Sequence, residues 1–144
     1  MEWIDEFGKE TTSIPPHIDG FAGFVYYIYY TDGSFYIGQK TVRSLRKKKL
    51  NKAEMLARPR KNSKDYKMVM TTHKWRNYEG SSKYSTGKTI QAKRIVTWLP
   101  TKRALTYVEA SMLFKVDALF DPKCLNANIL GKFHRNVLDF EEEL

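Results

Sequence analysis

The fold is decided by the stretch FVYYIYYTDGSFYIG, residues 24–38. Two runs of aromatic and β-branched residues flank one Asp-Gly pair, which is the sequence pattern of a β-hairpin. A strongly basic segment begins directly after it, so the hairpin and the cations are expected to share a surface. Tyrosine hydroxyls beside many positive charges indicate a surface that handles phosphate.

Two turn lengths are open for this hairpin, and they assign different faces to its tyrosines, because side chains alternate along a strand. A two-residue turn at the Asp-Gly pair places Tyr29 opposite Tyr36. A three-residue turn that begins at Thr31 and ends on a left-handed glycine places Tyr26 on one face with Tyr36 and Lys40. The residues themselves do not choose between these registers.

The composition indicates one folded domain with a polyanionic partner. The chain has 144 residues, of which 42% are hydrophobic and 14% aromatic, enough to bury a core. The formal net charge is +9, and it is unevenly placed: residues 40–76 hold 14 of the 25 Lys and Arg but only two carboxylates. The cationic character therefore belongs to one segment rather than to the whole surface.

Other residues restrict the kind of protein. Cys124 is the only cysteine, which excludes an internal disulfide and fits a reducing compartment. No apolar run approaches the roughly 18–20 residues that span a membrane. The three histidines are too scattered for a zinc motif. The acidic N-terminus lacks the features of a signal peptide, so a cytoplasmic location is expected.

Three further elements are expected after the hairpin. Residues 41–57 are interpreted as a basic helix that Pro59 ends. Residues 93–99 are interpreted as a third strand, ended by Pro100. Residues 102–120 are interpreted as a long helix, because apolar residues recur there at three- and four-residue steps. The predicted fold is α/β: a small three-stranded, mainly antiparallel sheet flanked by helices.

The chain is expected to form one domain between two acidic ends. Residues 1–22 are interpreted as an acidic leader, set apart by prolines and a glycine, and residues 139–144 as an acidic tail. The domain between them, residues 23–138, contains a basic insertion at about 47–76.

The hairpin resembles the paired signature of the GIY-YIG nuclease family. Tyr36-Ile37-Gly38 matches the second half, and Phe24-Val25-Tyr26 stands in place of Gly-Ile-Tyr in the first. The order that follows is also similar: an arginine on a basic helix, a Tyr-x-Gly-Ser turn at 78–81, a glutamate on a late helix and an asparagine after it. The resemblance covers roughly residues 24–130.

The resemblance implies a metal-dependent DNA endonuclease and a role for each residue. Tyr26 would activate or position the attacking water, with Tyr36 beside it. Arg46 would stabilise the pentacovalent phosphate. Glu109 would hold one divalent cation, Mg²⁺ or Mn²⁺, and Asn126 would brace the site. These roles suit phosphodiester hydrolysis, which needs an activated nucleophile and charge stabilisation.

Lys40 joins the catalytic set as a cation beside the tyrosines. An unperturbed phenol has a pKa near 10, so a tyrosine acts as a base only where positive charge lies close to it. A single carboxylate suits Mg²⁺, which keeps much of its hydration shell.

Glu109 has a structural alternative. With Thr106 it fits a capping box, in which the glutamate would only close a helix start. A helix that enters at Pro100-Thr101 would instead leave Glu109 in mid-helix, on a face whose neighbours are apolar.

Two other assignments have competitors, since Arg43 is the alternative to Arg46 and Asn128 the alternative to Asn126. The cations of the basic segment are expected to contact DNA phosphates. The expected DNA-binding residues are Arg43, Lys47, Lys48, Lys49, Arg58, Arg60, Lys61, Lys74 and Arg76.

The leading function is a DNA endonuclease, of homing type from a phage or mobile element, with duplex or branched DNA as its partner. A repair or structure-specific nuclease of the same fold is one alternative. A non-catalytic nucleic-acid-binding protein that has lost the chemistry is the other, since the first half of the signature departs from the family pattern.

Overall fold

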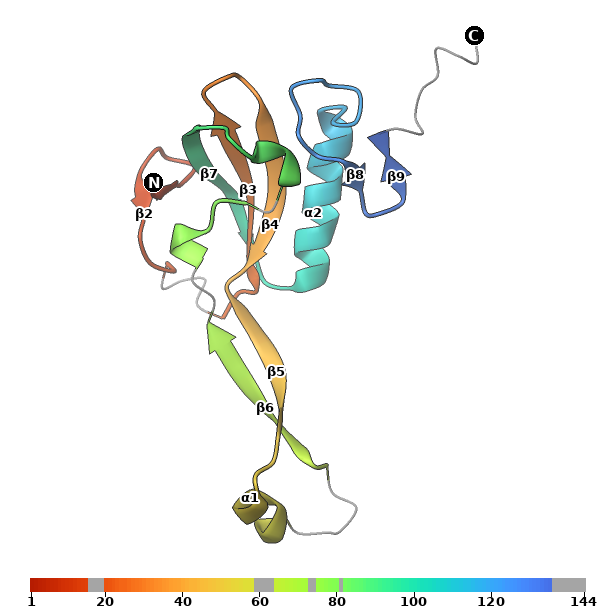
Figure 1. The fold of residues 1–144 in the computed structure, drawn as a ribbon. Helices are drawn as coiled ribbons and strands as arrows, with labels where there is room; N and C mark the ends of the chain where they lie inside the picture. Colours follow the sequence, from red (N-terminus) through yellow and green to blue (C-terminus); the bar gives the residue numbers. More distant parts are fainter. Residues whose placement is uncertain (16–19, 59–63, 73–74, 81, 136–144) are drawn as a thin grey trace.

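The structure is a computed structural model that describes residues 1–15, 20–58, 64–72, 75–80 and 82–135, with only the backbone of residues 43–47 and 68–72. Figure 1 shows one sheet with α2 against it and a two-stranded ribbon that projects away. None of the helices in these ranges is long and apolar enough to cross a bilayer. The elements are β1 (Trp3–Ile4), β2 (Glu10–Thr11), β3 (Gly23–Tyr30), β4 (Phe35–Thr41), β5 (Arg43–Lys49), α1 (Lys52–Ala57), β6 (Tyr66–Thr72), η2 (Trp75–Asn77), η3 (Lys83–Ser85), β7 (Ile90–Leu99), α2 (Lys102–Lys115), β8 (Asn128–Ile129) and β9 (Phe133–His134).

Strands β3 and β4 form the predicted hairpin, and its turn is the three-residue one. The amide of Tyr30 donates to the carbonyl of Ser34 (2.9 Å). Gly33 adopts φ 87°, a conformation that glycine takes without steric cost. Asp32 Oδ1 accepts from the Ser34 amide (2.9 Å) and hydroxyl (2.5 Å), and Lys88 pairs with the same carboxylate. These contacts hold the pKa of Asp32 well below its usual value.

The turn sets the register of the hairpin. Tyr26 pairs with Gly38, and Ile28 pairs with Tyr36. Because side chains alternate, Tyr26, Tyr36 and Lys40 lie on one face of the sheet. The three-residue alternative is therefore confirmed, and the two-residue turn is excluded.

The main sheet has five strands, in the order β2-β1-β7-β3-β4. The predicted third strand is present as β7, which pairs antiparallel with β3. The prediction of only three strands was wrong, because β1 pairs parallel with β7 and β2 turns back beside β1. Each of these extra strands has two residues, too few to show a periodic pattern in the sequence.

Trp3 fastens the N-terminal strands to the core. Its side chain is fully buried, and its ring lies edge-on to Phe24 (4.9 Å between centroids) and Tyr26 (5.1 Å). Its indole Nε1 donates to the carbonyl of Trp75 (2.9 Å). The amine of buried Lys93 lies 4.5 Å from the centroid of the Trp3 ring. The acidic N-terminal stretch thus contributes a central core residue.

The two faces of the sheet bury different clusters. Even-numbered residues of β3 point to one cluster, whose buried members are Trp3, Phe24, Tyr26, Ile28, Tyr30, Val42, Trp75 and Ile95. The other face packs against α2 and the segment after it, with buried Ile37, Ala110, Leu113, Ala118, Leu119, Cys124 and Ile129.

Helix α2 begins where the sequence predicts and ends earlier. Thr101 caps it, since its side chain accepts from the amide of Ala104 (3.1 Å). It ends at Lys115 rather than at residue 120, because Asp117 adopts φ 50°, outside the helical region. Glu109 therefore lies in mid-helix, and the capping-box alternative is excluded.

The predicted helix over residues 41–57 is wrong. Strand β5 occupies most of that range and pairs antiparallel with β6, so that Arg46 lies opposite Val69. Only the short α1 is helical, and it is closed by a capping box between Asn51 and Glu54. The error has a physical reason, because a ribbon depends on a partner strand far away in the sequence, which a local pattern does not reveal.

The core role of β1 is testable by replacing Trp3. Trp3→Ala should lower the free energy of unfolding by about 3–5 kcal/mol, because it removes a buried aromatic ring. Phe7→Ala is the matched control: Phe7 is 79% exposed, and its loss should change stability by about 0.5 kcal/mol or less. Urea unfolding followed by circular dichroism measures both. Similar small effects for the two variants would contradict the core placement of β1.

Candidate active site

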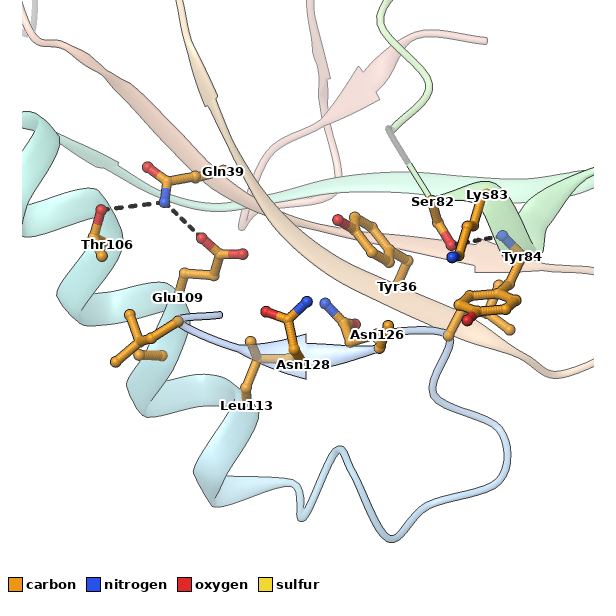
Figure 2. Close-up of a pocket in the computed structure, with 14 residues that line it drawn as sticks. Tyr36, Gln39, Ser82, Lys83, Tyr84, Thr106, Glu109, Leu113, Asn126 and Asn128 are labelled. Carbon is orange, nitrogen blue, oxygen red and sulfur yellow. Dashed lines mark hydrogen bonds between the residues drawn. The ribbon is translucent and has the colours of Figure 1, made fainter. Parts of the chain in front are cut away.

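A cavity of about 350 Å³ opens beside β4. Its walls come from four parts of the chain that are distant in sequence (Figure 2). Its lining residues are Tyr36 and Gln39 of β4, Thr106, Glu109, Ala110 and Leu113 of α2, Ser82, Lys83 and Tyr84 around η3, and Leu125, Asn126, Ala127, Asn128 and Leu130 after α2.

Tyr36 forms a wall of the cavity, and Tyr26 lies behind it. The two rings are tilted, with centroids 6.3 Å apart, and Tyr26 is almost completely buried. The contact depends on Gly38: a Cβ at that position would lie 2.6 Å from Cζ of Tyr26 and 3.0 Å from Cε1 of Tyr36. The glycine of the second half-motif is thus needed for the packing of both tyrosines.

Burial controls the protonation of Tyr26. Desolvation raises the pKa of its phenol well above the ordinary value, and the neighbouring Tyr78 and Tyr36 add to the increase. The phenol therefore keeps its proton and acts as a hydrogen-bonding group. This environment argues against activation of the water by Tyr26, one of the two roles that the family resemblance implies for it.

Glu109 enters the cavity from α2 and is held by Gln39. The amide Nε2 of Gln39 donates to Glu109 Oε2 (2.6 Å) and to Thr106 Oγ1 (3.3 Å). Lys102 Nζ in turn donates to Gln39 Oε1 (3.1 Å). Burial raises the pKa of Glu109, while the Gln39 hydrogen bond and the charge of Lys102 offset part of the increase. A carboxylate in this setting is stabilised by an added cation.

Asn126 ties the segment after α2 to β4. It is buried, and its amide makes a reciprocal pair with Ile37: Oδ1 accepts from the Ile37 amide (3.0 Å), and Nδ2 donates to its carbonyl (2.8 Å). Leu125 donates its amide to the carbonyl of Phe35 (2.8 Å). Asn128, the sequence alternative, is exposed, and its Oδ1 accepts from the Gly131 amide (2.9 Å). The bracing geometry thus belongs to Asn126.

Lys40 lies on the tyrosine face but outside the cavity lining. It is half-buried, and its Nζ lies 4.1 Å from the centroid of the Tyr78 ring. Tyr78 is itself edge-on to Tyr26, with centroids 6.0 Å apart. Lys40 therefore reaches Tyr26 through Tyr78 and supports the aromatic cluster behind the site.

The described cations that were predicted to bind DNA lie mostly on the ribbon, and Arg76 lies outside it on η2. Lys48 and Lys49 are exposed on β5, and Arg58 is half-buried after α1. Arg76 forms a bidentate ion pair with Glu2 (Nη2 to Oε1, 2.7 Å). Of Arg43, Arg46 and Lys47 only the backbone on β5 is described, and Arg60, Lys61 and Lys74 lie outside the described residues.

Gln39, Lys83 and Tyr84 also line the cavity, and the sequence did not single them out. Gln39 directly follows Tyr36-Ile37-Gly38 and lies on the same side of β4 as Ile37, which faces α2. Its place in the strand could therefore have indicated that it points toward the helix. Lys83 and Tyr84 belong to η3, a single short turn without a periodic pattern, and only the folded chain brings it to β4.

A comparison with protein-family models identifies the family of the chain that forms this cavity. The model described as "Putative endonuclease segE, GIY-YIG domain" matches residues 8–129. The chain belongs to the GIY-YIG nuclease family. No curated protein and no solved structure gave a match. The match begins after β1, so the strand that carries Trp3 lies outside the GIY-YIG region.

GIY-YIG nucleases generally use a divalent metal ion, and the cavity fits one held mainly by water. Glu109 is the only carboxylate among the lining residues that the structure describes. The described residues contain no group of three or more His, Cys, Asp or Glu side chains able to surround an ion. A half-buried carboxylate with a raised pKa, open to a cavity with room for several waters, suits a hydrated Mg²⁺ better than a dehydrated ion.

The buried charge of Glu109 should cost stability. The folded chain holds its proton more tightly than the unfolded chain, so stability falls as the pH rises from the ordinary pKa through the raised one. Glu109→Gln removes this titration. Its melting temperature relative to wild type should therefore be higher at about pH 7 than at about pH 4.

Glu54→Gln provides a control of opposite sign. Lys67 and the Asn51 amide lower the pKa of Glu54, so its contribution is present above the ordinary pKa and lost as the pH falls. This variant should lose stability relative to wild type at about pH 7 and recover at about pH 3. Thermal unfolding across pH measures both. The same sign for the two variants would contradict the environment assigned to Glu109.

Proposed function

We propose that the chain is a metal-dependent DNA endonuclease that hydrolyses phosphodiester bonds in the cavity beside β4. The observation that carries the proposal is the meeting of Tyr36, Glu109 and Asn126 in one cavity, although they come from β4, α2 and the segment after α2. Phosphodiester hydrolysis needs a positioned water, stabilisation of phosphate charge and a rigid site, and these residues supply such groups.

Each side chain has a defined part in this proposal. Tyr36 binds the attacking water or a phosphate oxygen at the cavity wall, and Tyr26 holds Tyr36 in place from behind. Glu109, oriented by Gln39, holds the divalent ion, Mg²⁺ or Mn²⁺. When bound there, the ion neutralises charge that develops on the phosphate. Asn126 keeps the segment after α2 against β4.

Arg46 completes the proposed catalytic set. Its backbone lies on β5, close in sequence to Lys40, which supports Tyr78 beside Tyr26. A guanidinium binds phosphate oxygens through two donors at once and keeps its charge at all relevant pH values. We assign it to the pentacovalent phosphate, with Arg43 as the alternative on the same strand.

A cleavage assay on supercoiled plasmid with Mg²⁺ tests the activity. Glu109→Ala should lower the rate by roughly 10²–10³-fold, because it removes the carboxylate that holds the ion. Tyr26→Phe should lower it by less, because the ring that holds Tyr36 in place remains; a loss of roughly 10²–10⁴-fold would show instead that the hydroxyl takes part in proton transfer. Gel electrophoresis separates nicked, linear and uncut DNA.

Each outcome of this assay is decisive. Equal cleavage by wild type and Glu109→Ala would refute the metal-ligand role. Absence of cleavage by wild type, with Mg²⁺ and Mn²⁺ and on plasmid, nicked and branched DNA, would favour a non-catalytic DNA-binding protein.

We further propose that the ribbon of β5, α1 and β6 supplies much of the affinity for DNA. Residues 43–72 carry eleven Lys and Arg against two carboxylates. Figure 1 shows that the ribbon projects from the sheet and carries α1 at its tip. Lys67 pairs with Glu54 (2.6 Å) and fastens α1 to β6. A two-stranded ribbon has the width of the DNA major groove, so duplex DNA is its best partner.

The dependence of DNA binding on salt tests the ribbon. The logarithm of the association constant should fall steeply with the logarithm of salt concentration, because bound phosphates release counterions. Replacing Lys48 and Lys49 by Ala should reduce that slope by roughly one unit for each lost phosphate contact. Fluorescence anisotropy of a labelled duplex measures the slope.

The matched control replaces Lys115 and Lys132 by Ala, which removes the same charge from exposed positions away from the ribbon. Its slope should stay close to that of wild type. A flat slope for wild type, or an equal change in both double variants, would overturn the role of the ribbon.

The biological setting is proposed from the sequence. A homing-type nuclease of a phage or mobile element, acting in the cytoplasm, is the leading reading, and a repair or structure-specific nuclease is the alternative. We propose residues 23–138 as the nuclease domain, with residues 47–76 as an insertion for DNA binding, and residues 1–22 and 139–144 as acidic ends. Cleavage of linear duplex in preference to branched DNA would favour the homing-type reading.

A further inference from the structure

A second hollow continues from the active-site cavity. It has a volume of about 950 Å³ and shares Lys83, Tyr84 and residues 125–128 with the first cavity. On its far side it reaches Cys124, His134 and Arg135. The two hollows therefore adjoin each other along these residues, and Tyr84 lines both.

Tyr84 presents an aromatic ring to solvent at this junction. The residue is 52% exposed, and its position is fixed by η3: its amide donates to Ser82 Oγ (3.2 Å), and Ser85 Oγ donates to the Ser82 carbonyl (2.8 Å). In Figure 2 its ring lies on the far side of Tyr36 from Glu109. An exposed ring on a backbone held in this way offers a flat surface for stacking.

The charge of the second hollow suits an anionic strand. Among the described residues, none that lines it is a carboxylate, and Lys83 and His134 are exposed at its edge. Lys83 Nζ lies 5.3 Å from the centroid of the Tyr84 ring, so a cation accompanies the aromatic surface. Stacking and a nearby positive charge are the combination by which proteins bind single-stranded nucleic acid.

Arg135 lines this hollow and holds the backbone around it in place. Its guanidinium donates to five backbone carbonyls, those of Ala118, Leu119, Asp121, Cys124 and Asn126, at 2.6–3.1 Å. These bonds occupy the guanidinium and fix the segment that forms the floor of both hollows. Arg135 is therefore a structural group here, and Lys83 is the cation available to a ligand.

We propose that the second hollow is a nucleotide subsite, in which the base next to the cleaved phosphodiester stacks on Tyr84 while Lys83 binds its phosphate. The proposal rests on the proposed function, since it requires the phosphodiester to lie in the first cavity. A base inside a duplex is already stacked between its neighbours. The subsite therefore requires a base that is unpaired or has left the stack beside the cut.

Photochemical cross-linking tests the stacking without any cleavage. The probe is a short single-stranded oligonucleotide made of iododeoxyuridine, which cross-links to aromatic side chains stacked on its base. In EDTA the principal cross-linked peptide should contain Tyr84, and Tyr84→Ala should reduce the yield by roughly tenfold. Tyr107→Ala is the matched control, because Tyr107 is 76% exposed on α2 but lines neither hollow.

Cleavage kinetics give the second readout. Tyr84→Ala should lower kcat/KM by roughly 5- to 100-fold, and Tyr84→Phe, which keeps the ring, should stay within about twofold of wild type. A nick or gap beside the cut should partly rescue Tyr84→Ala, because the base is then unstacked before binding.

The outcomes separate the subsite from the proposed activity. Cleavage by wild type with equal rates for Tyr84→Ala, and no cross-link at Tyr84, would overturn the subsite and leave the endonuclease intact. A cross-link at Tyr84 in a wild-type protein that cleaves nothing would support nucleotide binding in the hollow and refute the endonuclease.

Discussion

The turn between β3 and β4 is the constraint on which the rest of the site depends. Gly33 takes a left-handed conformation, and Asp32 binds Ser34, so the turn has three residues rather than two. A shift of one residue would move every side chain of β4 to the opposite face of the sheet. With the observed register, Tyr26 packs over Gly38, where no Cβ obstructs it, and Tyr36 forms a wall of the cavity.

From that hairpin the site is assembled by long-range contacts along β4. Asn126 binds both backbone groups of Ile37, and Gln39, two residues further along the same strand, orients Glu109 of α2. Burial then sets the chemistry, since it keeps the proton on Tyr26 and makes the carboxylate of Glu109 receptive to a cation. Positioning and electrostatics therefore come from the same packing.

The cavity and the basic ribbon are separate parts of the fold. The cavity lies beside β4 and α2, whereas β5 and β6 share no strand with the main sheet, and residues 43–72 hold eleven of the 25 Lys and Arg. β1 and Trp3 extend the core beyond the region that matches the family. The DNA-binding role that we propose for the ribbon would place affinity and cleavage on different elements of the described chain.

The sequence by itself determined four features, because each leaves a local signature. The Asp-Gly pair indicates the hairpin, and an apolar run indicates the strand β7. A capping threonine marks the start of α2, and the Tyr-Ile-Gly motif indicates the family. The sequence also singled out Tyr36, Glu109 and Asn126, which line the cavity. Only the tertiary structure decided the turn length, the pairing of β5 with β6 in place of a helix, the strands β1 and β2, and the approach of Gln39 and Tyr84 to the site. These features depend on partners distant in the chain, and local propensity carries no information about which distant segment supplies the hydrogen bonds.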